Sequence, residues 1–193
     1  MPIKYVTEIA KHSTKGTFAA RIGWRTGGRR YTTASMALPT SAVEALPPKS
    51  GVSARFHTCY GINEGPRVHD APLADILPLM LKVNAVAFSF EAANPRHEHE
   101  YHVFEQVKLP EGKLLIPGVI THASNIVEHP ELIAERLVRY ARLVGRENVV
   151  AGADCGFSSQ AIYNTEVHPT VVWTKFKAMA EGARLATRML WGR

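Results

Sequence analysis

Four side chains of this sequence, one histidine, two cysteines and one glutamate, could together bind a transition metal. They are His57, Cys59, Glu91 and Cys155. This mixture of imidazole, thiolate and carboxylate suits zinc better than calcium or magnesium, and its thiolates indicate a zinc ion that activates sulfur. The chain has only two cysteines, and both belong to the set. A single disulfide is the alternative, and it ranks below metal binding because the sequence lacks the cysteine density of a disulfide framework.

Each of these residues lies at or just beyond the carboxyl end of a predicted strand. Short apolar or alternating runs closed by Gly, Asn or Pro predict strands at 53–59, 85–91, 113–120 and 149–155. His57 and Cys59 are two residues apart, so both project from the same face of a strand. Parallel α/β folds place their chemistry at the carboxyl ends of strands, so the four side chains are expected to converge there.

Helical patterns alternate with these strands from Ser53 onward. They are predicted at 71–83, 96–108, 129–145 and from about Pro169 to Leu190. The alternation predicts an α/β fold of parallel (β/α) units with right-handed crossovers. Residues 1–52 break the rhythm and form an irregular basic segment with at most two strands and a short helix around 41–46.

The composition limits the classes of protein to consider. The chain has 193 residues, of which 46% are hydrophobic, and this is the size of one domain. No apolar run is long enough for a membrane helix and no secretory signal is evident, which predicts a cytoplasmic protein without a membrane partner. Residues 1–40 contain seven Lys or Arg and one Glu, which equals the whole net charge of +6. Nucleic-acid binding by this basic segment is a weaker alternative, because such segments are more often solvated surface.

Three segments resemble the metal-binding segments of cobalamin-independent methionine synthase, in the same order along the chain. They are His57-Thr58-Cys59-Tyr60, Phe88-Ser89-Phe90-Glu91-Ala92 and Ala153-Asp154-Cys155-Gly156-Phe157. Asn94-Pro95-Arg96-His97-Glu98 and His168-Pro169-Thr170 look closer to the short, single-domain relatives of that enzyme. The resemblance covers about residues 41–193.

The resemblance implies a barrel fold, a zinc cofactor and a methyl transfer. His57, Cys59, Glu91 and Cys155 would be the four zinc ligands in a (β/α)8 barrel. The protein would move a methyl group from a folate, 5-methyltetrahydropteroylglutamate, to the thiol of homocysteine, giving methionine. Alkyl transfer to another thiol, such as coenzyme M, is an alternative within the same superfamily.

Two further residues, His122 and Asp154, have two possible interpretations each. By the resemblance, His122 would be the histidine that protonates the departing folate nitrogen, and a pKa near neutrality would suit that role. The alternative is a histidine that hydrogen-bonds its own loop. Asp154 either orients a neighbouring metal ligand or caps the end of its strand.

The resemblance extends only to the second half of a barrel. A (β/α)8 barrel takes about 250 residues, whereas only four units follow residue 52 here. The family motif Gln-x-Asp-(Glu or Asp)-Pro, which grips the amino-acid substrate, has no counterpart. The expected fold is therefore an incomplete, half barrel with an open edge, and its inner face would carry Phe56, Val86, Phe88, Ile116 and Val150 or their neighbours. Self-association or a complementary amino-terminal half-barrel would cover it, and a non-catalytic zinc-binding fragment is the alternative to an enzyme.

Other polar and aromatic groups have simpler interpretations. The cluster His97-Glu98-His99-Glu100 is expected to be a solvated face at a helix start, rather than a second metal site. His69 and Asp70 are expected to cap the helix that follows them. Trp173, Phe176 and Met179 recur at helical spacing and are expected to lie in the core.

Overall fold

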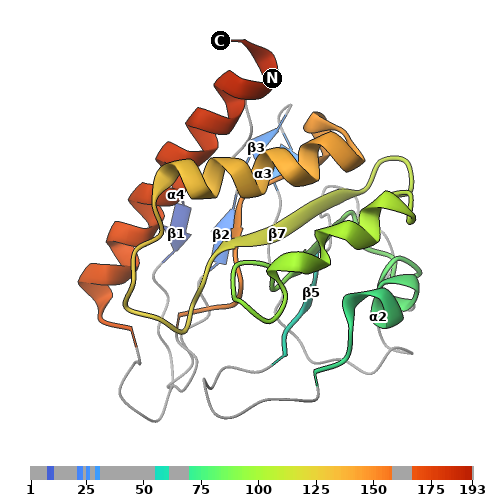
Figure 1. Cartoon of the computed structure of the whole chain (residues 1–193), viewed down its shortest axis with the longest axis horizontal. Coiled ribbons are helices and arrows are strands. Elements are labelled where there is room, and N and C mark those ends of the chain that lie inside the picture. The colour runs from blue at the N-terminus through green and yellow to red at the C-terminus, as the bar shows by residue number, and fades with distance from the viewer. Residues whose placement is uncertain are drawn as a thin grey trace.

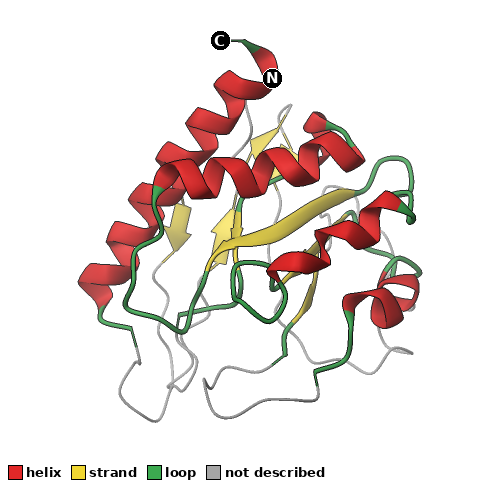
Figure 2. Cartoon of the chain, viewed as in Figure 1, coloured by secondary structure: helices red, strands yellow, loops and turns green. Residues whose placement is uncertain are grey.

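The computed structural model describes residues 8–10, 21–23, 25–26, 29–30, 55–60, 70–157 and 167–192. A parallel sheet of four strands forms its centre, and helices pack along it (Figure 2). The fold is therefore mixed α/β, as the sequence predicts. Within these described ranges, no helix has the length and apolar character needed to cross a membrane.

The sheet has the strand order β5-β6-β7-β8, and each neighbouring pair is parallel. Its strands are β5 (Arg55–Thr58), β6 (Ala87–Phe90), β7 (Leu114–Ile120) and β8 (Gly152–Ala153). Spatial order follows chain order, which is the arrangement of successive (β/α) units in a barrel wall. The four predicted strands are confirmed with shorter bounds, and residues 53 and 54 of the first prediction lie outside the described residues.

The helices in the described residues are α2 (Leu73–Met80), η1 (Glu98–Glu105), α3 (Pro130–Val144), η2 (Arg146–Asn148) and α4 (Pro169–Trp191). Local sequence signals mark both ends of α3. At the start of α3 the His129 ring accepts a hydrogen bond from the Glu131 backbone N–H, and Pro130 occupies the first turn. Gly145, with φ of 94°, ends the helix in a conformation that favours glycine. The predicted helix at 129–145 is confirmed.

The predicted helix at 96–108 is instead the shorter 3₁₀ helix η1. Long-range hydrogen bonds hold this segment in place. The Glu98 carboxylate accepts from the Arg136 guanidinium, and the Glu100 carboxylate accepts from the Leu73 backbone N–H. A polar segment fixed by such bonds gains little from the apolar stripe that stabilises a regular α-helix.

The main core lies between the sheet and the helices. Figure 1 shows α3 crossing the face of β7, with α4 against α3. Phe88, Phe90 and Leu115 from the sheet pack with Ile133 and Leu137 of α3. α3 and α4 approach closely at Gly182, where an added Cβ would lie 2.5 Å from the Cγ2 atom of Ile133. Glycine is therefore required at this crossing for space.

The other face of the sheet carries a smaller cluster of Ala87, Ile116 and Val150. Ile116 and Val150 are two of the residues that the sequence predicts, and at β6 the neighbouring residue Ala87 takes this position, because Phe88 is fully buried in the main core. Phe56 also packs against the main core. All four residues of β6 are buried, so neither face of this strand is exposed to solvent.

The described residues of the amino-terminal segment form four short strands, whereas the sequence predicts at most two. β1 (Glu8–Ala10) pairs with β2 (Arg21–Gly23), and β3 (Arg25–Thr26) pairs with β4 (Arg29–Arg30). Both pairs are antiparallel. Strands of two or three residues are too short for the alternation on which the prediction relies. The helix expected around 41–46 lies outside the described residues.

Candidate metal centre

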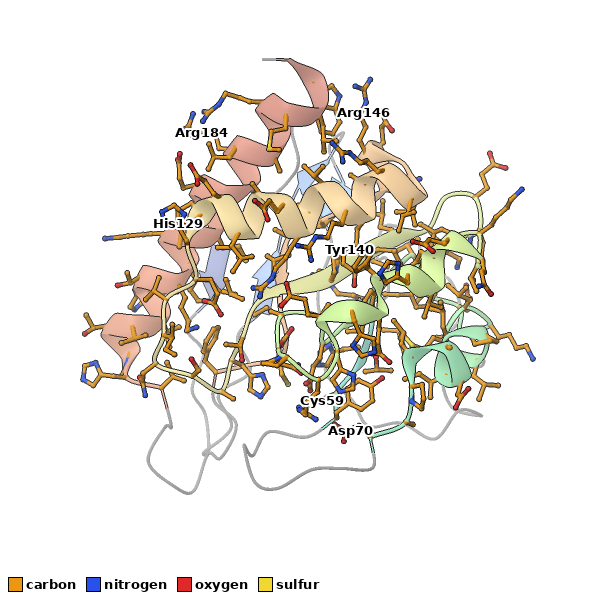
Figure 3. The ribbon with its side chains drawn as sticks, in the orientation of Figure 1. Cys59, Asp70, His129, Tyr140, Arg146 and Arg184 are labelled. Atoms are coloured by element: carbon orange, nitrogen blue, oxygen red, sulfur yellow. The ribbon has the colours of Figure 1, made fainter. Side chains whose placement is uncertain are left out.

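Three of the four predicted metal donors converge at the carboxyl end of the sheet. His57 is the third residue of β5, Cys59 directly follows this strand, and Cys155 follows β8 by two residues. One ligand atom from each of these residues lies within 4.8 Å of the others. Figure 3 labels Cys59 at this end of the sheet. A single ion could contact all three side chains.

This convergence requires a curved sheet, because β5 and β8 are its two outermost strands. Three strand spacings of about 4.8 Å would separate them by about 14 Å in a flat sheet. The Sγ atoms of Cys59 and Cys155 are nevertheless 3.5 Å apart. The sheet therefore curls at its carboxyl end in the manner of a barrel wall.

The separation of the sulfurs also suits a shared metal. Neither cysteine is in a disulfide. With Zn–S distances of about 2.3 Å, two sulfurs on one tetrahedral zinc lie about 3.8 Å apart. The observed 3.5 Å is close to this value. The thiol contact with Cys59 lowers the pKa of Cys155, and metal binding requires the thiolate.

The His57 ring is oriented by a hydrogen bond at one nitrogen. Its Nδ1 atom lies 3.1 Å from Ser89 Oγ on the adjacent strand β6. Its Nε2 atom is buried and has no hydrogen-bond partner in the described part of the chain. Metal-binding histidines commonly show this division, with one ring nitrogen held by a polar neighbour and the other facing the metal.

Glu91, the fourth predicted donor, lies beside this group but outside it. Its carboxylate accepts hydrogen bonds from the Tyr60 backbone N–H at 2.9 Å and from Asn94 Nδ2 at 3.0 Å. Arg96 Nη2 is 3.4 Å from the same carboxylate. Burial, with smaller contributions from the charges of Asp154 and Cys59, raises the pKa of Glu91 to about 7. Glu91 is thus close enough to the thiols to influence them electrostatically.

Asp154 connects the segments that carry Cys155 and Glu91. It is fully buried, and one carboxylate oxygen accepts hydrogen bonds from the backbone N–H groups of Ala92 and Ala93, each at 2.7 Å. The other oxygen accepts from Asn94 Nδ2 at 3.1 Å. Burial raises the pKa of Asp154. Of its two predicted roles, orientation of the neighbouring donors has this geometric support.

The predicted solvated face at 97–100 is wrong for two of its residues. His97 and Glu100 are buried, with relative exposures of 3% and 7%. The His97 ring stacks on Tyr60 with centroids 3.8 Å apart, and its nitrogens contact Glu100 at 2.8 Å and Asp70 at 3.2 Å. Burial follows because partners distant in the sequence satisfy both polar groups. His99 is exposed, as predicted.

Asp70 does not cap the following helix. Pro72 occupies the cap position of α2 without a side-chain hydrogen bond, whereas Asp70 pairs with Arg96 and His97. His69 lies outside the described residues. The sequence gives no local signal of this cluster, because its partners lie more than 25 residues apart.

His122 is buried in the loop that follows β7, at the carboxyl end of the sheet. It is not one of the three converging donors. Its role as a proton donor stays a prediction. The loop is anchored by Glu128, whose carboxylate accepts from the Thr121 backbone N–H at 2.7 Å and from Lys175 Nζ of α4 at 2.8 Å.

The aromatic stripe of α4 is only partly in the core. Met179 is buried and Phe176 is half-buried, but Trp173 is 53% exposed, so its predicted core position is wrong. Trp173 packs on Phe176 at the rim of the helix, with ring centroids 6.0 Å apart. A residue at the edge of an apolar stripe can satisfy the spacing and still face solvent.

Among solved structures, the chain is similar to a B12-independent methionine synthase from Shewanella sp. W3-18-1 in complex with selenomethionine. The TM-score is 0.59 and the sequence identity is 20%. The match covers 80% of this chain and 43% of the other, so the chain spans less than half the length of that structure. No family model and no curated protein matches the sequence. At this identity the similarity shows the fold alone, and it supports the predicted (β/α) barrel-type unit.

Proposed function

We propose that the chain holds one zinc ion through His57, Cys59 and Cys155, with Glu91 as a weaker or exchangeable fourth ligand. The observation that carries this proposal is the convergence of three donors from the two outermost strands within 4.8 Å. The donor set fits the ion: two thiols, and an imidazole whose buried Nε2 has no other partner among the described residues. Three protein ligands with a fourth, exchangeable position are typical of catalytic zinc sites.

We propose further that the site activates a thiol for alkyl transfer. A bound zinc ion lowers the pKa of a thiol and keeps it as the reactive thiolate at neutral pH. The contacts of Glu91 support an exchangeable fourth position on the metal. Its carboxylate accepts hydrogen bonds from the Tyr60 backbone N–H, Asn94 and Arg96. A carboxylate held in this way can remain in place when an incoming sulfur takes the fourth position.

The specific reaction that we propose is methyl transfer from 5-methyltetrahydropteroylglutamate to homocysteine. The sequence segments around the donors and the similarity of the fold to a B12-independent methionine synthase both support it. His122 is the proposed proton donor, because it lies in a loop at the same end of the sheet. The chain would act in the cytoplasm.

Completion of the substrate site is part of this proposal. β5 and β8 each pair on one side only within the described residues. A closed barrel needs further parallel strands at these edges. We propose that a second copy or a complementary half-barrel supplies them, and only the latter would bring the amino-acid binding motif.

The test combines ligand binding with product formation. The cobalt-substituted protein should gain intensity in its thiolate-to-cobalt absorption band when homocysteine is added, and mass spectrometry should detect methionine when the methyl folate is present. Coenzyme M in place of homocysteine tests the alternative acceptor. A cobalt spectrum that no thiol changes would contradict thiol activation and would leave zinc with a structural role.

A further inference from the structure

We propose that Asp154 is a positioning residue that fixes the spacing of the metal donors by reaching across Gly118 of the strand between them. This inference rests on the proposed metal site. It concerns how two metal ligands, Cys155 after β8 and Glu91 after β6, keep their relative position although β7 lies between these two strands. Hydrogen bonds within the sheet join each strand only to its neighbours.

The Asp154 side chain spans this gap. Its backbone N–H donates to Ile120 O at 2.9 Å, which holds the residue against the end of β7. Its carboxylate passes beyond β7 to the backbone N–H groups of Ala92 and Ala93 at the end of β6. Cys155 follows Asp154 directly, and Glu91 precedes Ala92 directly. One buried carboxylate therefore joins the two backbone segments that carry these donors.

The carboxylate can take this path only because residue 118 is glycine. An added Cβ at Gly118 would lie 1.9 Å from Asp154 Oδ1 and 2.8 Å from Asp154 Cα. Gly118 is not among the glycines with positive φ, so its backbone conformation does not require glycine. The requirement is space for the side chain of Asp154. Gly118 and Asp154 form a matched pair of residues that are 36 positions apart in the sequence.

Asn94 extends the connection to Glu91 itself. Its Nδ2 group donates to Asp154 Oδ2 at 3.1 Å and to Glu91 Oε2 at 3.0 Å. The Asp154 carboxylate thus receives three hydrogen bonds, and all come from the turn that follows β6. Charge-assisted hydrogen bonds of this kind are short and directional, which suits a positioning role.

The test uses two variants and a matched control. Gly118→Ala places a methyl group in the path of the carboxylate. Asp154→Asn keeps the size of the side chain but turns an NH2 group toward N–H donors. Gly152→Ala is the control, because Gly152 pairs with Gly118 in the sheet and its added Cβ would instead meet the Ile116 side chain at 2.7 Å.

The readouts separate positioning from general stability. Competition with a chromophoric chelator should show zinc affinity lowered by about 10–100-fold in Gly118→Ala and Asp154→Asn, the usual effect of removing a partner that orients a ligand. The cobalt-substituted variants should also lose intensity in the thiolate-to-cobalt band. Gly152→Ala should lower the urea midpoint of unfolding and leave zinc affinity unchanged. Should Gly118→Ala fail to fold, Asp154→Asn, which adds no bulk, decides the test.

A second readout needs no metal, so it separates this inference from the proposed function. In metal-free protein, diamide should close a Cys59–Cys155 disulfide in the control, and more slowly in the two variants. Wild-type zinc affinity and cobalt spectrum in both variants would overturn the inference. If the wild type binds no zinc, the proposed function fails, and disulfide closure at equal rates in wild type and variants would then overturn the positioning role as well.

Discussion

The buried ion pair between Lys175 and Glu128 should be the most costly to break of the polar contacts that hold the loop after β7. The Lys175 side chain is fully buried, and its Nζ donates to Glu128 Oε2 at 2.8 Å and to the Ile126 carbonyl. Lys175→Met keeps the apolar stem but leaves a buried carboxylate whose one remaining hydrogen-bond partner among the described residues is the Thr121 N–H. Removing one partner of a buried pair costs about 3–5 kcal/mol in free energy of unfolding.

Urea unfolding followed by circular dichroism measures this cost. With a slope of about 2 kcal/mol per molar urea, the midpoint should fall by about 1.5–2.5 M. Lys177→Met, on the exposed side of the same helix, should cost less than about 0.5 kcal/mol. The double variant Lys175→Met, Glu128→Gln should recover part of the loss, because neither charge remains. A cost below about 1 kcal/mol for Lys175→Met, or a double variant that loses the sum of both single losses, would refute this reasoning.

Three further predictions concern acid stability, oxidation and assembly. The hydrogen bond from Arg136 lowers the pKa of Glu98, so the stability that this carboxylate contributes is present above its unfolded pKa of about 4.3 and is lost as the pH falls through the folded value. Glu98→Gln should therefore cost about 1–3 kcal/mol at pH 7 and much less at pH 3 in urea unfolding, and an equal cost at both would contradict the assignment. Mild oxidation of metal-free protein should join Cys59 to Cys155, whose sulfurs are 3.5 Å apart, and saturating zinc should prevent it; peptide mapping would reveal the link. Because both outer strands have an unpaired edge within the described sheet, sedimentation should show more than one chain per particle, and a stable monomer that binds no apolar dye would contradict this.

The sequence predicts where the strands and helices lie better than it predicts which face of a strand each side chain occupies. Apolar runs closed by turn residues mark the strands, and a histidine, a proline and a glycine mark the ends of α3. The face that Phe88 occupies could not be read, because β6 is buried on both sides. The short strands before residue 31 escaped for a different reason, since two or three residues do not establish a period.

The candidate site divides in the same way. The residue types were sufficient to predict metal binding by the two cysteines, and the two-residue spacing of His57 and Cys59 was sufficient to predict that these two side chains share a face of their strand. The surroundings of the site were not predictable, because they depend on pairs that are distant in the sequence. His97 can be buried because Asp70 and Glu100 contact its two ring nitrogens. The Asp154 side chain can reach β6 because residue 118 has no side chain. No local pattern shows either relationship.

The measurement that tests the central claim most directly is zinc-edge X-ray absorption of the full chain, together with its metal content. We predict about one zinc per chain, with two sulfur ligands at about 2.3 Å and the remaining ligands nitrogen or oxygen at about 2.0–2.2 Å. The double variant Cys59→Ser, Cys155→Ser should lose the sulfur scattering and most of the metal, and Glu91→Gln should lose less. Zinc bound at full stoichiometry by the double variant, or a wild-type zinc without sulfur ligands, would contradict the proposed site.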